Sequence, residues 1–192
     1  MSIEIKGRWK KGFAHDVHTL GSVYMGADEY GHDRWDTTRS EMGELVYQLK
    51  YRDDKSAISK IVDLLGRYKG LETMDAIIPM PSTNKHRATQ PVYAIAQELG
   101  ARLGVPVMED ALEKSAGGAQ LKNVEDADER ETLLKERMAL TGHHDLSEMN
   151  VLLLDDLYRS GSTLIVATDI LYDQAKCKNV YILTMTKTRS RR

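Results

Sequence analysis

The sequence predicts an α/β fold in which helices flank a central, mostly parallel sheet. Three observations lead to this prediction. Two short aliphatic runs, at residues 75–78 and 151–154, are continuous rather than alternating, as in strands buried on both faces. Helical periodicity follows each run, and a third aliphatic run at residues 180–184 comes after the second helix. Strand, helix and strand in this order form a right-handed βαβ unit, whose strands are parallel.

Size and composition narrow the class of protein. The chain has 192 residues, which fits one domain with a core that needs no structural metal. Cys177 is its only cysteine, which excludes an internal disulfide and a zinc site built on several thiolates. The formal net charge is -2 and no apolar run reaches the length of a membrane span. We therefore expect a cytoplasmic protein that binds neither a membrane nor, directly, nucleic acid.

Residues 1–70 are expected to form an N-terminal lobe with helices packed on the core, and residues 71–192 the α/β core itself. The first forty residues lack a clear period, which predicts an irregular lobe apart from a short strand at 19–24. Two helices are then predicted from apolar residues at helical spacing. These residues are Leu45, Val46 and Leu49, followed by Ile58, Ile61, Val62 and Leu65.

The core is predicted to begin with the strand at 75–78, which ends at Pro79. Pro91 suits the first turn of a helix, and residues 105–107 predict a second short strand after it. The polar run at 113–129 predicts a long loop, and loops of that length in compact domains are functional or disordered.

The most informative segment is 151–163, with the sequence Val-Leu-Leu-Leu-Asp-Asp-Leu-Tyr-Arg-Ser-Gly-Ser-Thr. Its carboxylates, Asp155 and Asp156, come where the buried strand emerges at the carboxyl edge of the sheet, which is where α/β folds bind ligands. Consecutive strand side chains point to opposite faces. Both carboxylates can therefore face one ligand only if the backbone begins to turn there.

Residues 160–163 form the turn at the start of the next helix. Its unpaired amide groups and the positive end of the helix dipole can hold an anion. Gly161 can adopt a positive φ, and Ser160, Ser162 and Thr163 add hydroxyl donors. A phosphate in this turn beside a diol held by the carboxylates describes ribose 5-phosphate. The alternative is that the acids cap local backbone and the turn only starts a helix; the fixed register of run, acids and turn favours the ligand site.

Residues 151–163 resemble the thirteen-residue phosphoribosyl pyrophosphate (PRPP) fingerprint of the type I phosphoribosyltransferases, with every class position filled. The resemblance implies a type I phosphoribosyltransferase-like fold with a hood over its site. The family often has Thr-Thr-Gly-Ala-Thr at the centre of the fingerprint. This chain differs mainly in Arg159, which can itself meet phosphate.

Further matches resemble the ComF-like branch of that family, proteins associated in some bacteria with DNA uptake. Residues 41–53 are similar to its helix with a Lys-Tyr-Arg ending, and residues 78–81 to its Pro-Val-Pro loop. Gln120 and Arg130 resemble a Gln and an Arg of its flexible segment. Two features depart from the branch. This chain cannot build the Cys-rich zinc module that often begins its members, and residues 87–90 are shorter than the usual Arg-Gly-Phe-Asn-Gln.

The resemblance implies a Mg²⁺-dependent phosphoribosyltransferase, in which a nitrogenous base or amine displaces pyrophosphate from PRPP. Asp155 and Asp156 would be the catalytic pair, holding the ribose hydroxyls and, through water, Mg²⁺. The ribose 5-phosphate would be bound by Arg159, Ser160, Gly161, Ser162 and Thr163. The pyrophosphate would be bound by Pro81, Ser82, Thr83, Lys85 and Arg87. The candidates from the hood are Lys114, Gln120, Lys122 and Arg130.

Other interpretations stay open at this point. One is a non-catalytic regulator that binds PRPP or a nucleotide, or a ComF-like accessory protein in DNA uptake. A Rossmann-type enzyme is disfavoured, because no Gly-x-Gly-x-x-Gly follows a strand. His143 and His144 lack a third metal ligand at useful spacing. The acceptor pocket is expected from the first forty residues and from 183–188, and a homodimer is a plausible assembly.

Overall fold

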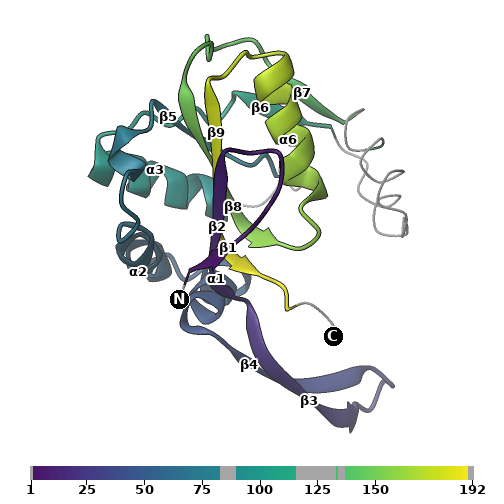
Figure 1. The fold of residues 1–192 in the computed structure, drawn as a ribbon. Helices are drawn as coiled ribbons and strands as arrows, with labels where there is room; N and C mark the ends of the chain where they lie inside the picture. The colour runs from purple at the N-terminus through teal and green to yellow at the C-terminus, as the bar shows by residue number, and fades with distance from the viewer. Residues whose placement is uncertain (1, 83–89, 116–132, 134–136, 190–192) are drawn as a thin grey trace.

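The computed structural model of the chain describes residues 2–82, 90–115, 133 and 137–189 (Figure 1). Its centre is a five-stranded sheet in the order β1-β2-β9-β8-β5. The strands are β1 (Ile3–Glu4), β2 (Lys11–Val17), β9 (Asn179–Lys187), β8 (Asn150–Tyr158) and β5 (Ala76–Pro79). All neighbouring pairs are parallel except β1 with β2. The prediction of an α/β fold with a mostly parallel sheet is confirmed.

Helices cover both faces of this sheet, as Figure 1 shows. They are α1 (Glu41–Arg52), α2 (Ser56–Leu65), α3 (Pro91–Leu103) and α6 (Ser162–Asp173), with a 3₁₀ turn at Leu71–Thr73. Helix α6 packs on one face with Val151 and Leu153 of β8, while α1, α2 and α3 pack on the other with Leu152 and Leu154. Strand β8 is therefore buried on both sides, which explains why its aliphatic run does not alternate.

The first forty residues are regular rather than irregular, which corrects the prediction made for this lobe. Strand β2 extends the central sheet through parallel pairing with β9. Strands β3 (Thr19–Ala27) and β4 (Asp33–Arg39) form an antiparallel hairpin, which includes the short strand expected at 19–24. The sheet thus continues across the expected boundary at residue 70, and the division of the chain there stays a prediction.

The connection between β5 and β8 holds smaller elements. Val107 forms an isolated parallel bridge with Ile77, in the place of the short strand predicted at 105–107. Strands β6 (Leu112–Lys114) and β7 (Met138–Leu140) pair as a second antiparallel ribbon. None of the described helices combines the length and the apolar character that crossing a bilayer requires.

Candidate functional site

The two segments singled out by the sequence meet at the carboxyl edge of the sheet. Strand β5 ends at Pro79, which is in register with Leu154 of β8. The amide of Met80 then donates to the carbonyl of Leu154 (2.8 Å), so the loop after β5 leaves beside Asp155. Parallel pairing therefore places the predicted pyrophosphate loop next to the acidic pair.

A cavity of about 220 Å³ opens at this edge, and both Asp155 and Asp156 line it. Strand β8 does not turn at these residues but continues to Tyr158 in an unchanged register with β9. The Asp155 side chain bends along the strand instead, since the amide of Asp156 donates to its Oδ1 (2.8 Å). A change in side-chain direction, rather than the expected backbone turn, accompanies the two acids at one cavity.

The two carboxyl groups differ in their surroundings. Asp156 forms an ion pair with the Nζ of Lys50, which comes from the last turn of α1. Burial raises the pKa of Asp155 to about 7, and the neighbouring charge of Asp156 raises it further, against smaller opposing effects of Lys50 and Lys114. Near neutral pH, Asp155 is therefore poised between its acid and its carboxylate.

The turn after β8 has the geometry of an anion site. Gly161 has a φ of 85° and precedes the first turn of α6. The first hydrogen bond into the helix runs from the Ile165 amide to the Gly161 carbonyl (2.9 Å). No hydrogen bond among the described residues uses the amides of Thr163 and Leu164. These donors, at the positive end of the helix dipole, remain available to a ligand.

Glycine is required at position 161 for two reasons. Its positive φ is strained for other residues. In addition, a Cβ at this position would lie 2.8 Å from the hydroxyl of Tyr158, whose ring covers the turn. A cavity of about 90 Å³ is lined by this turn, including Arg159, Ser160 and Ser162.

The small cavity and the larger one share Asp155 and Thr163. The turn and the acidic pair thus belong to one continuous depression, with amides and hydroxyls at one end and carboxylates at the other. This is the relative placement that the sequence predicts for a phosphate beside a diol.

The structure brings some of the other predicted residues to the same place. Pro81 and Ser82 line the larger cavity, as does Lys114 at the end of β6. The remaining predicted residues of the pyrophosphate loop and hood lie outside the described residues: Thr83, Lys85, Arg87, Gln120, Lys122 and Arg130.

Sequence reasoning missed Lys50, Gln90 and Tyr93, which also line the larger cavity. A signal for Lys50 was present, because it follows the buried Leu49 and lies four residues after the buried Val46. A lysine on the buried face of an amphipathic helix needs a partner. Gln90 and Tyr93 flank the start of α3 and carry no comparable signal.

The side of the site toward β9 and β2 holds a chain of polar contacts. The hydroxyl of Thr186 donates to the carbonyl of Asp156 (3.0 Å), and the Nδ1 of His18 lies 3.1 Å from the same hydroxyl oxygen. Burial lowers the pKa of His18, and the charge of Arg39 lowers it further, although Asp156 opposes this. These residues come from the regions where the sequence predicts the acceptor pocket.

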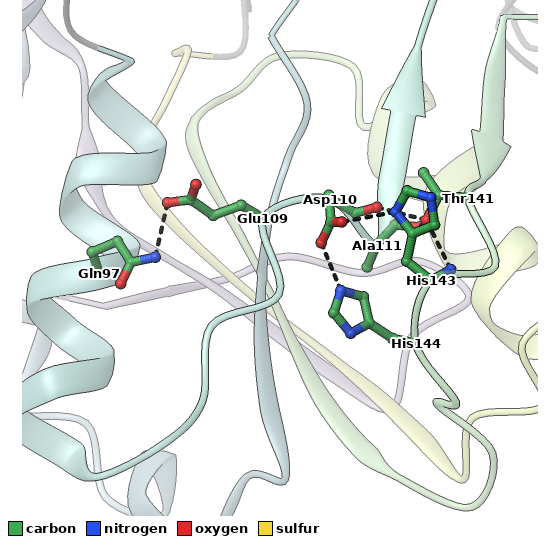
Figure 2. Close-up of polar contacts among 7 residues, drawn as sticks. All are labelled: Gln97, Glu109, Asp110, Ala111, Thr141, His143 and His144. Atoms are coloured by element: carbon green, nitrogen blue, oxygen red, sulfur yellow. Dashed lines mark hydrogen bonds and ion pairs between the residues drawn. The ribbon is translucent and has the colours of Figure 1, made fainter.

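A second cavity, of about 450 Å³, shares Pro81, Ser82 and Lys114 with the first. Its outer wall includes the polar cluster of Figure 2, in which Asp110 contacts His143 Nδ1 (2.8 Å) and His144 Nε2 (2.6 Å). Hydrogen bonds from His144 and then His143 lower the pKa of Asp110 to about 2. The cluster fastens the segment after β7 to the segment before β6, and so braces the ribbon that carries Lys114.

Comparisons with known proteins find similarity only among solved structures. No protein-family model and no curated protein matches the chain. Adenine phosphoribosyltransferase from Thermoanaerobacter pseudethanolicus is 12% identical, with 87% of this chain and 94% of that chain covered at a TM-score of 0.45. The enzyme of the same name from Leishmania tarentolae is 13% identical, covering 86% and 83%, with a TM-score of 0.46. Orotate phosphoribosyltransferase from Aeropyrum pernix is 15% identical, covering 87% and 73%, at 0.42. Because these TM-scores are below 0.5, the case for a function rests on the residues of the site.

Proposed function

We propose that this chain is a cytoplasmic, Mg²⁺-dependent phosphoribosyltransferase that uses PRPP as donor and a nitrogenous base or amine as acceptor. One observation carries the proposal: two cavities share Asp155 and Thr163, and they place unused helix amides and a carboxylate pair at opposite ends of one depression. The fingerprint resemblance of residues 151–163 points to the same ligand.

The 5-phosphate would occupy the turn at the start of α6. The amides of Thr163 and Leu164 and the hydroxyls of Ser160 and Ser162 would donate to its oxygens, and Arg159 lines the same cavity. Each hydrogen bond to a charged group contributes about 1.5 to 3 kcal/mol. Two or three of them suffice to fix the position of the ribose.

Asp155 and Asp156 would accept hydrogen bonds from the ribose hydroxyls. Only the ionised form of Asp155 can accept at both oxygens, so its raised pKa makes ribose binding depend on pH. Lys50 keeps Asp156 charged and oriented through their ion pair. Pro81, Ser82 and Lys114 would meet the pyrophosphate on the β5 side.

The donor set fits Mg²⁺, which prefers oxygen ligands and is commonly held by one or two carboxylates together with substrate phosphates. The part of the chain that the structure describes has no cluster of three metal-ligating side chains. Asp155 and Asp156 would therefore hold the ion, through water, together with oxygens of PRPP. When bound, the ion would neutralise charge on the pyrophosphate leaving group.

In the proposed reaction, a bond forms between the acceptor nitrogen and C1′ of the ribose. The bond from C1′ to the pyrophosphate oxygen breaks, and the oxygen leaves with the electron pair. The acceptor nitrogen loses its proton. The protein contributes by holding the reactants in line and stabilising the developing charge. With the pyrophosphate on the β5 side, the acceptor would approach from the β9 side, where Thr186 and His18 lie.

The narrower assignment to the ComF-like branch rests on the matches at residues 41–53 and 78–81. Helix α1 gives the first match a place in the site, since its Lys50 pairs with Asp156. The second match contains Met80 and Pro81, which line the cavity beside the acids.

Calorimetric titration with PRPP and Mg²⁺, followed by an assay of pyrophosphate release against a panel of bases and amines, tests the proposal. We expect saturable binding, and release with at least one acceptor. The double variant Asp155→Asn with Asp156→Asn should lose PRPP binding. The matched control is Asp173→Asn, an exposed carboxylate at the end of α6, and it should bind PRPP normally.

The outcomes separate the alternatives. Unchanged PRPP affinity in the double variant would remove the ribose role of the acids. Tight binding to the wild type with no release for any acceptor would favour a regulator over an enzyme.

A further inference from the structure

The hairpin formed by β3 and β4, residues 19–39, is called the arm below. Figure 1 shows that it projects away from the body of the molecule beyond the end of α1. The two strands pair with each other and form a sheet of their own, separate from the central one. Its root lies at the carboxyl edge, where β2 ends at Val17 and α1 begins at Glu41.

The arm exposes large apolar side chains to an unusual extent. Val23 is 64% exposed, Met25 61%, Trp35 57% and Tyr30 78%; Leu20 and Tyr24 are also more than half exposed. Tyr24 and Trp35 contact each other across the strands, with ring centroids 5.2 Å apart, so they form a joint aromatic surface. Six large apolar side chains in one short hairpin make an apolar patch rather than scattered exposure.

Physical chemistry predicts that such an arm needs a partner. A two-stranded hairpin is marginally stable in water, and a third strand or a covering surface is needed for lasting stability. The three exposed aromatic side chains alone offer roughly 300 to 450 Å² of surface for burial. That is a large part of the roughly 800 Å² that each partner contributes to a standard protein interface.

The two edges of the arm differ in their protection. Strand β3, Thr-Leu-Gly-Ser-Val-Tyr-Met-Gly-Ala, contains no charged residue and no proline, whereas β4 contains Asp33, Arg34, Asp36 and Arg39. Proteins protect free edge strands with charges, prolines and bulges. Bulges flank the regular stretch from Gly21 to Tyr24, but this stretch itself is open. Of the outer edge of β3, the described residues show only the Leu20 carbonyl in use, by Arg189.

We propose that β3 pairs with β3 of a second copy of this chain, antiparallel and near Val23, to form a continuous four-stranded sheet. An uncharged strand is suited to pairing with itself, because a two-fold axis would otherwise place like charges opposite each other. Both copies gain what each lacks, since a four-stranded ribbon meets the requirement for independent stability.

The charge of the arm argues against other occupants. It carries Asp28, Glu29, Asp33 and Asp36 but only two arginines, Arg34 and Arg39. A net negative, aromatic ribbon is poorly suited to nucleic acid or to an anionic membrane, both of which repel it. A second copy meets no such repulsion, because the strand at the axis is neutral. The inference is independent of the proposed enzymatic activity.

Light scattering coupled to size-exclusion chromatography tests the pairing on the full chain. We expect the wild type to have twice the monomer mass of 21.7 kDa. Val23→Lys should shift the mass to that of the monomer, because it places two positive charges near the axis. The matched control is Thr38→Lys, an exposed position on β4, and it should remain dimeric. Circular dichroism of both variants confirms that the fold is intact.

A cross-linking experiment reports on proximity directly. Cys177 is the only cysteine and is buried, so Val23→Cys introduces a single accessible thiol. Directly opposed residues in antiparallel strands have Cβ atoms about 4.5 to 5.5 Å apart, near enough for a disulfide after small adjustment. Oxidised Val23→Cys should run as a covalent dimer on a non-reducing gel, and Thr38→Cys should not.

Two results would overturn the proposal. A wild type that stays monomeric over a concentration series would leave the arm to a partner of another kind. A dimer that persists in Val23→Lys, without cross-linking of Val23→Cys, would place the interface elsewhere on the chain.

Discussion

The two ends of the central sheet show opposite ways of using a strand. Strand β8 is buried on both faces, carries the acidic pair and runs into the turn at α6. Strand β2, near the other edge, leads into the arm, whose side chains are largely exposed. Rigid burial on one side fixes the ligand groups. On the other side, exposed surface is left for an acceptor and, as proposed, for a second copy of the chain.

Truncation of one apolar side chain in each region should expose this difference most strongly. Leu153 is fully buried in β8, whereas Val23 is 64% exposed in the arm. Leu153→Ala should lower the free energy of unfolding by about 3 kcal/mol, because it leaves a cavity. Val23→Ala should change that of the monomer by less than about 0.5 kcal/mol. Urea denaturation measures both, and equal losses would refute the contrast.

The glycine of the turn gives the next largest effect. Gly161→Val forces a side chain against Tyr158 and strains a positive φ, so the amides can no longer surround a phosphate. Losing two charge-assisted hydrogen bonds should weaken ribose 5-phosphate binding about a hundredfold or more. Calorimetry measures this affinity. The matched control is Gly142→Val, which also has a positive φ but has open space at its Cβ, and its affinity should stay near that of the wild type.

The ion pair between α1 and β8 should contribute less. Lys50→Met leaves the largely buried carboxylate of Asp156 without its cation. We expect a loss of about 1 to 2 kcal/mol in unfolding free energy, as for other unpaired buried acceptors. Arg102→Met removes an exposed cation from Asp63 on α2 and should hardly change stability. If both variants unfold at the same urea concentration, the pair is no more than a surface contact.

The smallest effect concerns pH. The pKa of Asp155 is about 7 in the folded chain, against 3.8 as its ordinary value. Between these values the folded state binds more protons than the unfolded one, so raising the pH should lower stability across this range. Asp155→Asn should flatten this dependence, and Asp173→Asn should leave it in place. PRPP affinity should rise over the same range, as Asp155 ionises. A slope that survives in Asp155→Asn would assign it to another group.

Sequence patterns reached the two regions unequally, for physical reasons. The aliphatic run of β8, the stripe of α3 and the turn at Gly161 are local signals, because burial on both faces and a helix start need particular residues nearby. Strand β2 is held by pairing with β9, some 170 residues away in the chain, and its own sequence alternates weakly. The arm has no buried face to impose a period.

The site was predictable to a similar degree. The acids and the turn lie in one segment, so their spacing is visible in the sequence. Lys50 joins them only through the packing of α1, and Gln90 and Tyr93 only through the start of α3. Contacts that form across the fold leave little trace in either partner's local pattern.

Amide NMR during titration with ribose 5-phosphate tests the central claim most directly. If the turn at the start of α6 holds the phosphate, the amide resonances of Ser162, Thr163 and Leu164 should shift most, and in proportion to saturation. Shifts that gather elsewhere while these three amides stay unchanged would contradict the account.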